Sequence, residues 1–455
     1  MKRKVITSFF MTCLCLLGYQ VNGQTSLTDL VNYTLKHSRD IKKSELQCKE
    51  ADYLRKEVIG NGLPQIESTA SYSIMMYDVD VPQSVYDMVN KYVPVDNQQM
   101  VTGILKGIDD IDKIKMFSAG IQVTQLLYSQ SYLVGLKTSK KAQELYSILK
   151  NKSEEDVIDE VATGYYQAGS LILQLQTFDK SIKNLKEIYR IAELNYQNDL
   201  IKESQVNRLK VTISNLEVTR QTIDNGVTIQ LNYLKALAGM PSDSSLVIDT
   251  TMLVNDFINK NTSSTFAIEN VPAYRALLKQ DEIYGQQIKL AKATYLPTLA
   301  AFGKYSFSSG GVGSGDMSKI NSYPTIGLSF SMPIFSSGVN YYKLKQSQVK
   351  QLQLHEDIAK TKDLLTISYN NAFLEYQTAN SLLSAQKENK ELAQKVYNQT
   401  SLQYQEGMAS MADLLNVNSD YLQADNSYNQ QILKCKTAEI KMLKASGNLK
   451  SLVKQ

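Results

Sequence analysis

The sequence contains two copies of one pattern. LPQIESTASYS at 63–73 resembles LPTLAAFGKYS at 296–306, at a numbering offset of 233. GIQVTQLLYS at 120–129 resembles GLSFSMPIFS at 327–336, at an offset of 207. LNYQNDLIKESQVN at 194–207 resembles LQYQEGMASMADLL at 402–415, at an offset of 208. Self-similarity of this kind is typical of a repeated architecture. The last two offsets differ by one, so we expect rigid rods of matched length between them.

The 26-residue difference between the first two offsets falls at one place in each copy. The offset falls from 233 to 207 between the first two pairs, at 77–116 in copy one and at 310–323 in copy two. Surface loops tolerate insertions better than the elements they connect. We therefore expect a loop insertion at 77–116.

The matched segments carry a helical pattern. Apolar residues recur at alternating steps of four and three, which average 3.5 and predict coiled-coil packing. From about Ser129 to Asn198 the rod has some 70 residues, on the order of 100 Å at ~1.5 Å per residue. Asn, Gln, Ser and Thr dilute these stripes, which fits either a second face lined by water or a solvated exterior. The apolar positions include Leu171, Leu175, Phe178, Ile182 and Leu185 in copy one and Val417, Tyr421, Ala424 and Tyr428 in copy two.

Between the rods the period changes from about 3.5 to 2, which predicts four strands. Their expected bounds are about 63–80, 116–127, 296–308 and 324–334. Apolar residues alternate with polar ones, as transmembrane β-barrels require, although a soluble half-buried sheet alternates too. The apolar residues are Ile66, Ala70, Tyr72, Ile74 and Met76, then Phe117, Ala119, Ile121 and Val123, then Leu299, Ala301, Tyr305 and Phe307, and finally Ile326, Leu328, Phe330 and Met332.

Four strands are too few to close a barrel, because the smallest known barrels have about eight. An open edge in a membrane leaves backbone groups unpaired, at several kcal/mol each. If these strands enter a membrane, several chains must share one barrel.

The first 23 residues read as a secretory signal peptide. MKRK is a basic n-region, VITSFFMTCLCLLGY is a short apolar h-region, and Gly23 is a small residue at a plausible cleavage point. The apolar stretch is too short for a good transmembrane helix. In the alternative lipoprotein reading Cys13 or Cys15 is acylated, but no small-residue lipobox precedes either. Two further cysteines, Cys48 and Cys435, can pair in an exported chain; we expect two packed thiols instead.

The sequence contains little that indicates nucleic-acid binding, metal binding, phosphate binding or catalysis. The net charge is +4, and Lys2, Arg3 and Lys4 supply three of those charges, so no nucleic-acid partner is indicated. His37 and His355 lie in no metal-spaced cluster. GVGSG at 311–315 lacks the strand–loop–helix setting of a phosphate loop and reads as a hairpin loop at a barrel mouth. No catalytic motif is present, so we expect neither enzyme activity nor a cofactor.

The layout resembles the TolC family of outer-membrane channel proteins over essentially the whole mature chain. Leu63-Pro64 and Leu296-Pro297 enter the strands, GLSFSMPIFSSG at 327–338 leaves them, and Tyr404-x-x-Gly407 is followed by Asp413-Leu414-Leu415. The resemblance implies a mainly α-helical fold with transmembrane β-strands. A homotrimer would share a 12-strand barrel in the cell outer membrane, and its helical hairpins would form an α-barrel tunnel in the periplasm. The implied domains are residues 24–240 and 269–455, with a polar linker at 241–268 beside the helical barrel.

The resemblance also implies a function. The trimer would be the passive exit duct of a tripartite efflux or type I secretion system, opened by a periplasmic adaptor and an inner-membrane transporter. Its other contact would be outer-membrane lipid, and its cargo drugs, other small molecules or polypeptide. The main alternative is a non-conducting periplasmic coiled-coil adaptor, which normally has a lipoyl-like β domain. A soluble periplasmic binding protein would need a compact α/β pattern that is absent here.

The helix breaks are the sites of interest, since the resemblance places them at the periplasmic entrance. There Asp413 matches an acid of the aperture ring, Asn416 stands where a second acid is often found, Ala409 where an Arg can stand, and Gln205 matches an acid of the first tip. We expect a hinge that has lost much of its charged latch and is held by weaker contacts, or by Tyr404 and its neighbours. Alternatively, Asp413 is a solvated acid stabilised by a helix N-terminus. The candidate gate residues are Tyr196, Gln205, Tyr404, Gly407, Asp413 and Asn416.

Overall fold

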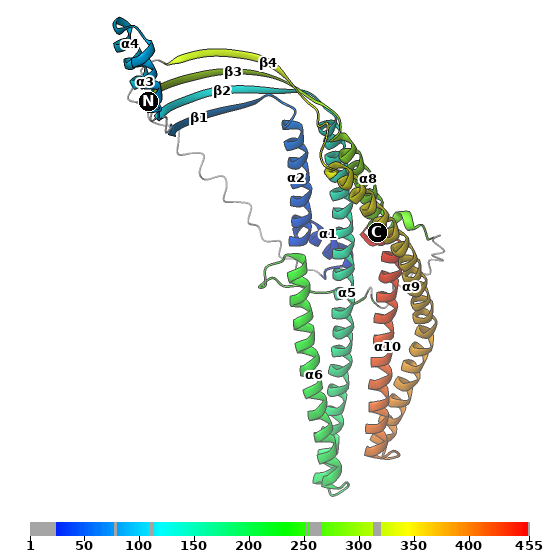
Figure 1. Cartoon of the computed structure of the whole chain (residues 1–455). Helices are drawn as coiled ribbons and strands as arrows, with labels where there is room; N and C mark the ends of the chain where they lie inside the picture. Colours follow the sequence, from blue (N-terminus) through cyan, green and yellow to red (C-terminus); the bar gives the residue numbers. More distant parts are fainter. Residues whose placement is uncertain are drawn as a thin grey trace, which may run out of the picture. The chain divides into compact units, whose positions relative to one another are not determined.

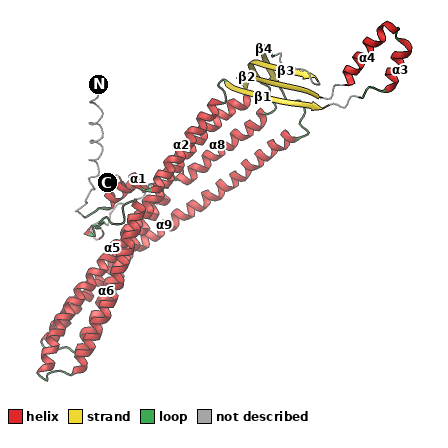
Figure 2. Ribbon diagram, turned by 90° about the vertical axis from the view of Figure 1, so that its left-hand side faces the viewer, coloured by secondary structure: helices red, strands yellow, loops and turns green. Residues whose placement is uncertain are grey.

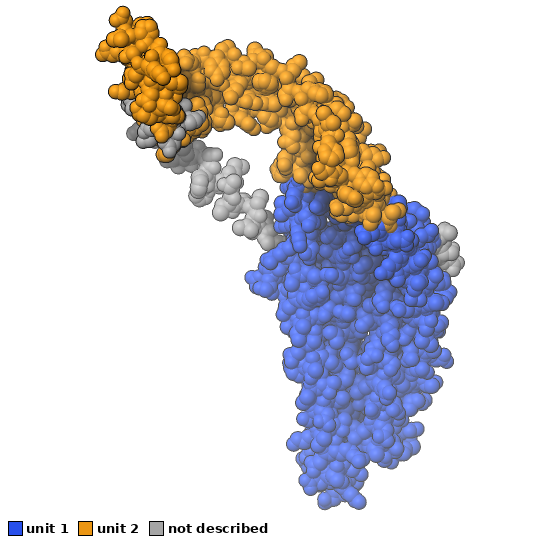
Figure 3. All heavy atoms as spheres, in the orientation of Figure 1, with its two compact units in different colours: residues 1–50, 144–280, 353–455 blue, residues 51–143, 281–352 orange. Residues whose placement is uncertain are grey.

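The computed structural model describes residues 24–76, 80–109, 113–251, 253, 266–312 and 320–453, so the predicted signal peptide lies outside the described residues. The chain divides into two compact units (Figure 3). Unit 1 comprises Met1–Glu50, Glu144–Gln280 and Gln353–Gln455, and unit 2 comprises Ala51–Gln143 and Asp281–Leu352.

The order of elements repeats the duplication seen in the sequence (Figure 1). The matching helices α2 and α8 have a numbering offset of 233 at both ends, and the two long hairpins α5–α6 and α9–α10 are offset by 207 to 209. The elements are α1 (Leu27–His37), α2 (Arg39–Gly60), β1 (Gln65–Met76), α3 (Gln83–Tyr92), α4 (Val95–Asp109), β2 (Lys113–Ser129), α5 (Gln130–Gln197), α6 (Glu203–Ala238), η1 (Ile268–Asn270), α8 (Pro272–Ala293), β3 (Thr298–Val312), β4 (Asn321–Ser331), α9 (Val339–Gln405), α10 (Met411–Ala445) and η2 (Leu449–Val453).

Four residues with positive φ end the helices of the two hairpins. Asp199 (58°) and Gly407 (77°) follow α5 and α9, and Gly239 (69°) and Gly447 (71°) follow α6 and α10. The two members of each pair occupy equivalent positions in the two copies. At all four the backbone forms the same capping pattern: the N–H of the next residue donates to the carbonyl five residues back, as from Met408 to Gln403. Left-handed capping by Gly, or by Asn and Asp, is the usual way to stop a helix. The predicted breaks are therefore confirmed as helix ends.

Gly407 and Gly239 differ in the space around their Cα atoms, so alanine should be tolerated differently at the two positions. A Cβ added at Gly407 would meet nothing within 4 Å, whereas one at Gly239 would lie 2.6 Å from the carbonyl oxygen of His37. Gly407→Ala should lower the free energy of unfolding by about 1 kcal/mol through backbone strain alone. Gly239→Ala should cost more, because a backbone contact must also shift. Denaturant unfolding of both variants tests this, and equal losses would contradict it.

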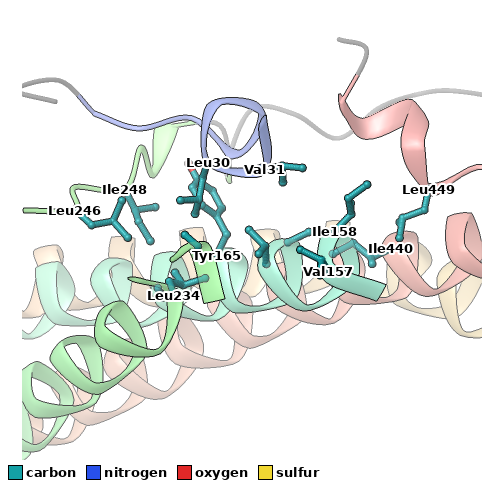
Figure 4. Packing of buried hydrophobic residues seen from close by; sticks show 14 of the residues in the cluster. Leu30, Val31, Val157, Ile158, Tyr165, Leu234, Leu246, Ile248, Ile440 and Leu449 are labelled. Atoms are coloured by element: carbon teal, nitrogen blue, oxygen red, sulfur yellow. The ribbon is translucent and has the colours of Figure 1, made fainter. Parts of the chain in front are cut away.

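The main core of unit 1 lies where α1, the segment around Ile248 and the C-terminal residues cover α5 (Figure 4). Tyr165 on α5 is nearly fully buried, and its hydroxyl lies 3.1 Å from the carbonyl oxygen of Thr25 and 3.0 Å from that of Asp249. The segment expected to be a polar linker thus contributes apolar side chains to a core. The labelled members of this core are Leu30, Val31, Val157, Ile158, Tyr165, Leu234, Leu246, Ile248, Ile440 and Leu449.

Unit 2 contains an antiparallel sheet in the order β1-β2-β3-β4 (Figure 2). Its register confirms that the predicted apolar residues share one face, except Met332, which follows the end of β4. Ile66 lies opposite Val123, Val123 opposite Gly303, and Gly303 opposite Ile326. The other face is polar, and on it the hydroxyls of Ser71 and Ser118 lie 2.9 Å apart. Strands β1 and β4 are the two edges, and neither has a partner on its outer side among the described residues.

Two expectations for the sheet need correction. The fourth strand was expected to continue to residue 334, but β4 ends at Ser331. Pro333 follows, and proline has no N–H to donate to a neighbouring strand. The insertion at 77–116 was expected to be a loop, but it contains the helices α3 and α4. Part of the predicted hairpin loop at 311–315, from residue 313 on, lies outside the described residues.

Within the part of the chain that the structure describes, no helix is long and apolar enough to cross a membrane. No group of three or more His, Cys, Asp and Glu residues there has metal-site geometry. Cys48 is half-buried and Cys435 is buried, and both are free, as predicted. Burial raises the pKa of the Cys435 thiol to about 11, so this thiol stays protonated at neutral pH.

Candidate functional site

The tips of both hairpins belong to unit 1 and pack against one another. An apolar cluster joins the ends of α5 and α9 to the starts of α6 and α10, and Tyr404 is partly buried against it. The rings of Tyr397 on α9 and Tyr421 on α10 stack at 5.8 Å beside this cluster. Apolar and aromatic contacts thus hold the two tips together. The buried members are Leu185, Ile188, Ala192, Val206, Leu209, Ile213, Tyr397, Met411 and Leu414.

Asp413 is exposed and takes part in a capping box at the start of α10. Its backbone N–H donates to Oγ of Ser410 (3.1 Å), while its Oδ2 accepts from the N–H (3.1 Å) and the hydroxyl (2.6 Å) of Ser410. These hydrogen bonds, from the side chain first and then from the backbone, lower the pKa of the Asp413 carboxyl. The carboxylate therefore stays charged at neutral pH and is held at the helix N-terminus. This geometry matches the helix-capping interpretation and leaves the ring interpretation untested.

The tip of copy one lacks such a charged cap. The residue at the start of α6 that corresponds to Ser410 is Lys202, and its side chain makes no capping hydrogen bond. Gln205 stands where Asp413 stands in copy two, and it is partly buried. Tyr196 is exposed near the end of α5, and Asn416 is exposed on α10. The structure thus brings the six candidate residues to the two tips but gives only one tip a carboxylate in a capping box.

A polar seam between α5 and α10 was not predicted. It consists of three side-chain hydrogen bonds above the tips. Ser181 donates to Asn418 (2.8 Å), Thr177 donates to Oδ2 of Asp425 (2.7 Å), and Gln174 donates to Asn426 (2.9 Å). Because Ser181 and Asn418 are buried, these bonds fix one register between the two hairpins.

Asp425 is the centre of this seam. Its side chain is 2% exposed, and Nζ of Lys390 on α9 lies 2.6 Å from its Oδ1. Asn429 donates to its Oδ2 (2.9 Å), and the Lys390 ammonium also lies over the ring of Tyr428. The buried carboxylate therefore ties α9, α10 and α5 together. Asn418 and Asp425 are spaced by seven residues, and the buried Ile432 follows at the same heptad position, so two polar residues share a buried position with an apolar one.

The contacts among the four helices give their order across unit 1, which Figure 1 shows as α6, α5, α10 and α9. Lys186 and Glu217 pair α5 with α6 at 2.6 Å, and Gln431 on α10 donates to the carbonyl of Ala379 on α9 (2.7 Å). The outer helices keep large apolar side chains exposed. On α6 these include Val211, Val218 and Ile229, and on α9 Leu364, Ile367, Leu374, Leu382, Leu392 and Val396.

Comparison with known proteins agrees with this architecture. The profile of the family described as "Outer membrane efflux protein" matches residues 266–448, which include most of copy two. The chain is 24% identical over 316 residues to outer membrane protein TolC of Salmonella enteritidis, and 24% identical over 318 residues to TolC of Escherichia coli strain K12. Each match covers 66% of this chain and 62% of the relative, which is less than two thirds of the relative's length. The chain thus contains an outer membrane efflux protein domain and is similar to TolC over about two thirds of its length.

The fold of the TolC family extends over both copies. The crystal structure of the Campylobacter jejuni CmeC outer membrane channel superimposes with a TM-score of 0.73 at 17% identity, covering 93% of this chain and 86% of that one. This likeness confirms the predicted fold, with long helical hairpins and four strands in each chain. The similarity to outer-membrane proteins agrees with the predicted outer-membrane location. The matches are to channel proteins rather than to enzymes.

Proposed function

We propose that three copies of this chain form an efflux duct in the outer membrane. The observation that carries the proposal is the pair of open edges. The sheet of unit 2 ends in the unpaired strands β1 and β4, and the helical layer of unit 1 ends in the apolar outer faces of α6 and α9. Head-to-tail contact between different surfaces generates a ring when the rotation closes. Three copies would give the 12 strands implied by the family.

The direction of the strands fits this closure. All three pairings within the sheet are antiparallel, so β1 and β4 run in opposite directions. When β4 of one copy meets β1 of the next, the new pair is antiparallel too. The apolar face would then meet lipid, and the polar face with Ser71 and Ser118 would line the interior. The division into 24–240, 241–268 and 269–455 remains part of this proposal.

The duct would act passively. It would join a periplasmic adaptor and an inner-membrane transporter at the hairpin tips, and the transporter would supply the energy. Fractionation of the expressed protein tests the duct against the alternative adaptor. We expect trimers in the outer-membrane fraction that migrate differently before and after heating. Recovery in the soluble periplasm without detergent would contradict the duct.

The tips would form the gate of this duct. The apolar cluster with Tyr397, Tyr404 and Tyr421 would hold them closed, and three copies of Asp413 would surround the aperture. The sequence indicates that few charged contacts remain at the tips themselves. The ionic contact of the gate would lie above the tips, between Lys390 and Asp425. Apolar contacts would therefore close the tips, and the ionic contact would act at a different level of the helices.

The charge of Asp413 can be removed while the cap is kept, because the amide oxygen of Asn still accepts the Ser410 hydrogen bonds. Asp413→Asn should reduce the cation-to-anion permeability ratio of the trimer in planar bilayers, since a ring of carboxylates favours cations. Asp243→Asn, at an exposed acid outside the tips, is the matched control and should leave the ratio unchanged. An unchanged ratio for Asp413→Asn would remove Asp413 from the aperture.

A further inference from the structure

The helical insertion between β1 and β2 has no counterpart in copy two. Helices α3 and α4 form a hairpin that Figure 2 shows beyond the ends of the strands. The chain enters it after Met76 and leaves it before Lys113, whereas the other ends of β1 and β2 adjoin α2 and α5. The hairpin therefore lies at the end of the sheet opposite to those helices.

This hairpin cannot bury its own apolar surface. Among its described side chains only Val89 is buried, and Val85, Tyr86, Val101 and Leu105 are half-buried. The helices have 10 and 15 residues. Isolated helices shorter than about 12–15 residues are marginal in water. A stable hairpin needs a further surface to cover it.

The uncovered apolar residues form an ordered stripe. On α4, Met100, Ile104 and Ile108 are spaced by four residues and are 66%, 57% and 39% exposed. On α3, Met88 and Tyr92 have the same spacing and are also exposed. Residues four apart share one face of a helix, so each helix presents a continuous apolar strip.

The charges of the segment argue against a membrane surface as the covering. Residues 83–109 contain three acids and two lysines, so their net charge is −1. Helices that lie on anionic membranes are rich in Lys and Arg on the polar face. A nearly neutral hairpin also meets a second copy of itself without strong repulsion.

The position of the hairpin favours a second copy as the occupant. Strand β1 is an open edge of the sheet, and α3 begins seven residues after it ends. The hairpin is thus attached beside the edge at which the neighbouring copy would join the barrel. We propose that the three hairpins pack against one another through the stripe Met100, Ile104, Ile108 and form a cap at the outer end of the barrel. This inference rests on the proposed trimer.

Cysteine cross-linking tests the cap. Ile104→Cys is placed in a background with Cys48→Ser and Cys435→Ala, and intact cells are treated with a short bismaleimide. The matched control is Asn90→Cys, an exposed position on α3 about half a turn away from Met88 and Tyr92. We expect covalent dimers from Ile104→Cys at five times the yield from Asn90→Cys or more, since one cysteine per chain joins only two chains.

Unheated gels of the same samples separate the two possible failures. Intact trimers without dimers at Ile104→Cys, or with equal yields at both positions, would overturn the cap and leave the duct in place. Adducts of Ile104→Cys with a different protein would overturn it as well. Absence of trimers before cross-linking would instead contradict the proposed duct. As a second test, replacing 80–110 by a short Gly-Ser linker should raise single-channel conductance at least twofold; unchanged conductance would overturn the cap.

Discussion

Ile326→Lys is expected to abolish assembly of heat-stable trimers in the outer membrane. Ile326 is on the edge strand β4, belongs to the apolar face of the sheet and is 90% exposed in the single chain. A lysine on the lipid face of a barrel costs about 2–4 kcal/mol at the middle of the membrane. Three copies carry three such lysines in one barrel, which is comparable to the whole stability of a typical domain.

The adjacent residue provides the matched control. Thr325 is on the same strand and is also exposed, but its side chain belongs to the opposite, polar face. Thr325→Lys adds the same charge to the proposed interior and should assemble normally. The two variants are compared by fractionation and by gel mobility before and after heating. Equal assembly of both, or failure of Thr325→Lys alone, would mean that the apolar face does not meet lipid.

Lys390→Ala should destabilise the helical unit by about 3–5 kcal/mol, because it leaves the Asp425 carboxylate buried without its counter-charge. Lys387→Ala is the control: its ammonium lies 4.0 Å from Glu391 and both side chains are exposed, so it should change stability by less than about 1 kcal/mol. Denaturant unfolding followed by circular dichroism measures both.

A double variant separates the two possible causes of that loss. Lys390→Met with Asp425→Leu removes both charges, and buried ion pairs replaced by apolar residues often cost little. We expect the double variant to recover most of the stability lost in Lys390→Ala. If both variants are equally unstable, packing around Lys390 rather than the ionic contact stabilises α9 against α10.

Much of the fold follows from the sequence because the duplication constrains it. The constant offset between the two copies predicted paired helix ends, and Gly239 and Gly447 adopt the same left-handed conformation. Alternation of period two predicted the faces of the strands, since a pleated strand has no other period. Ile66, Val123 and Ile326 accordingly lie in one row.

The features that the sequence did not predict, the helices α3 and α4 and the Lys390–Asp425 contact, each occur in only one of the two copies. The insertion at 77–116 has no partner in copy two, so comparison of the copies gave no pattern for α3 and α4. The Lys390–Asp425 contact joins different helices, and the copy-one residue that corresponds to Asp425 is Glu217. Glu217 instead forms an ion pair with Lys186 between half-exposed side chains. Spacing within one helix does not reveal which of two such acids is buried.

Cross-linking of β1 to β4 is the most direct test of a shared barrel. One cysteine is placed at Thr69 on the polar face of β1, and a second is moved along the polar face of β4 at Thr325, Gly327 and Ser329, in a background without Cys48 and Cys435. Antiparallel neighbours bring one of these pairs into disulfide range. The account predicts a covalent trimer at one position, because three head-to-tail bonds close a ring. Monomers at every position, despite intact insertion, would contradict the shared barrel.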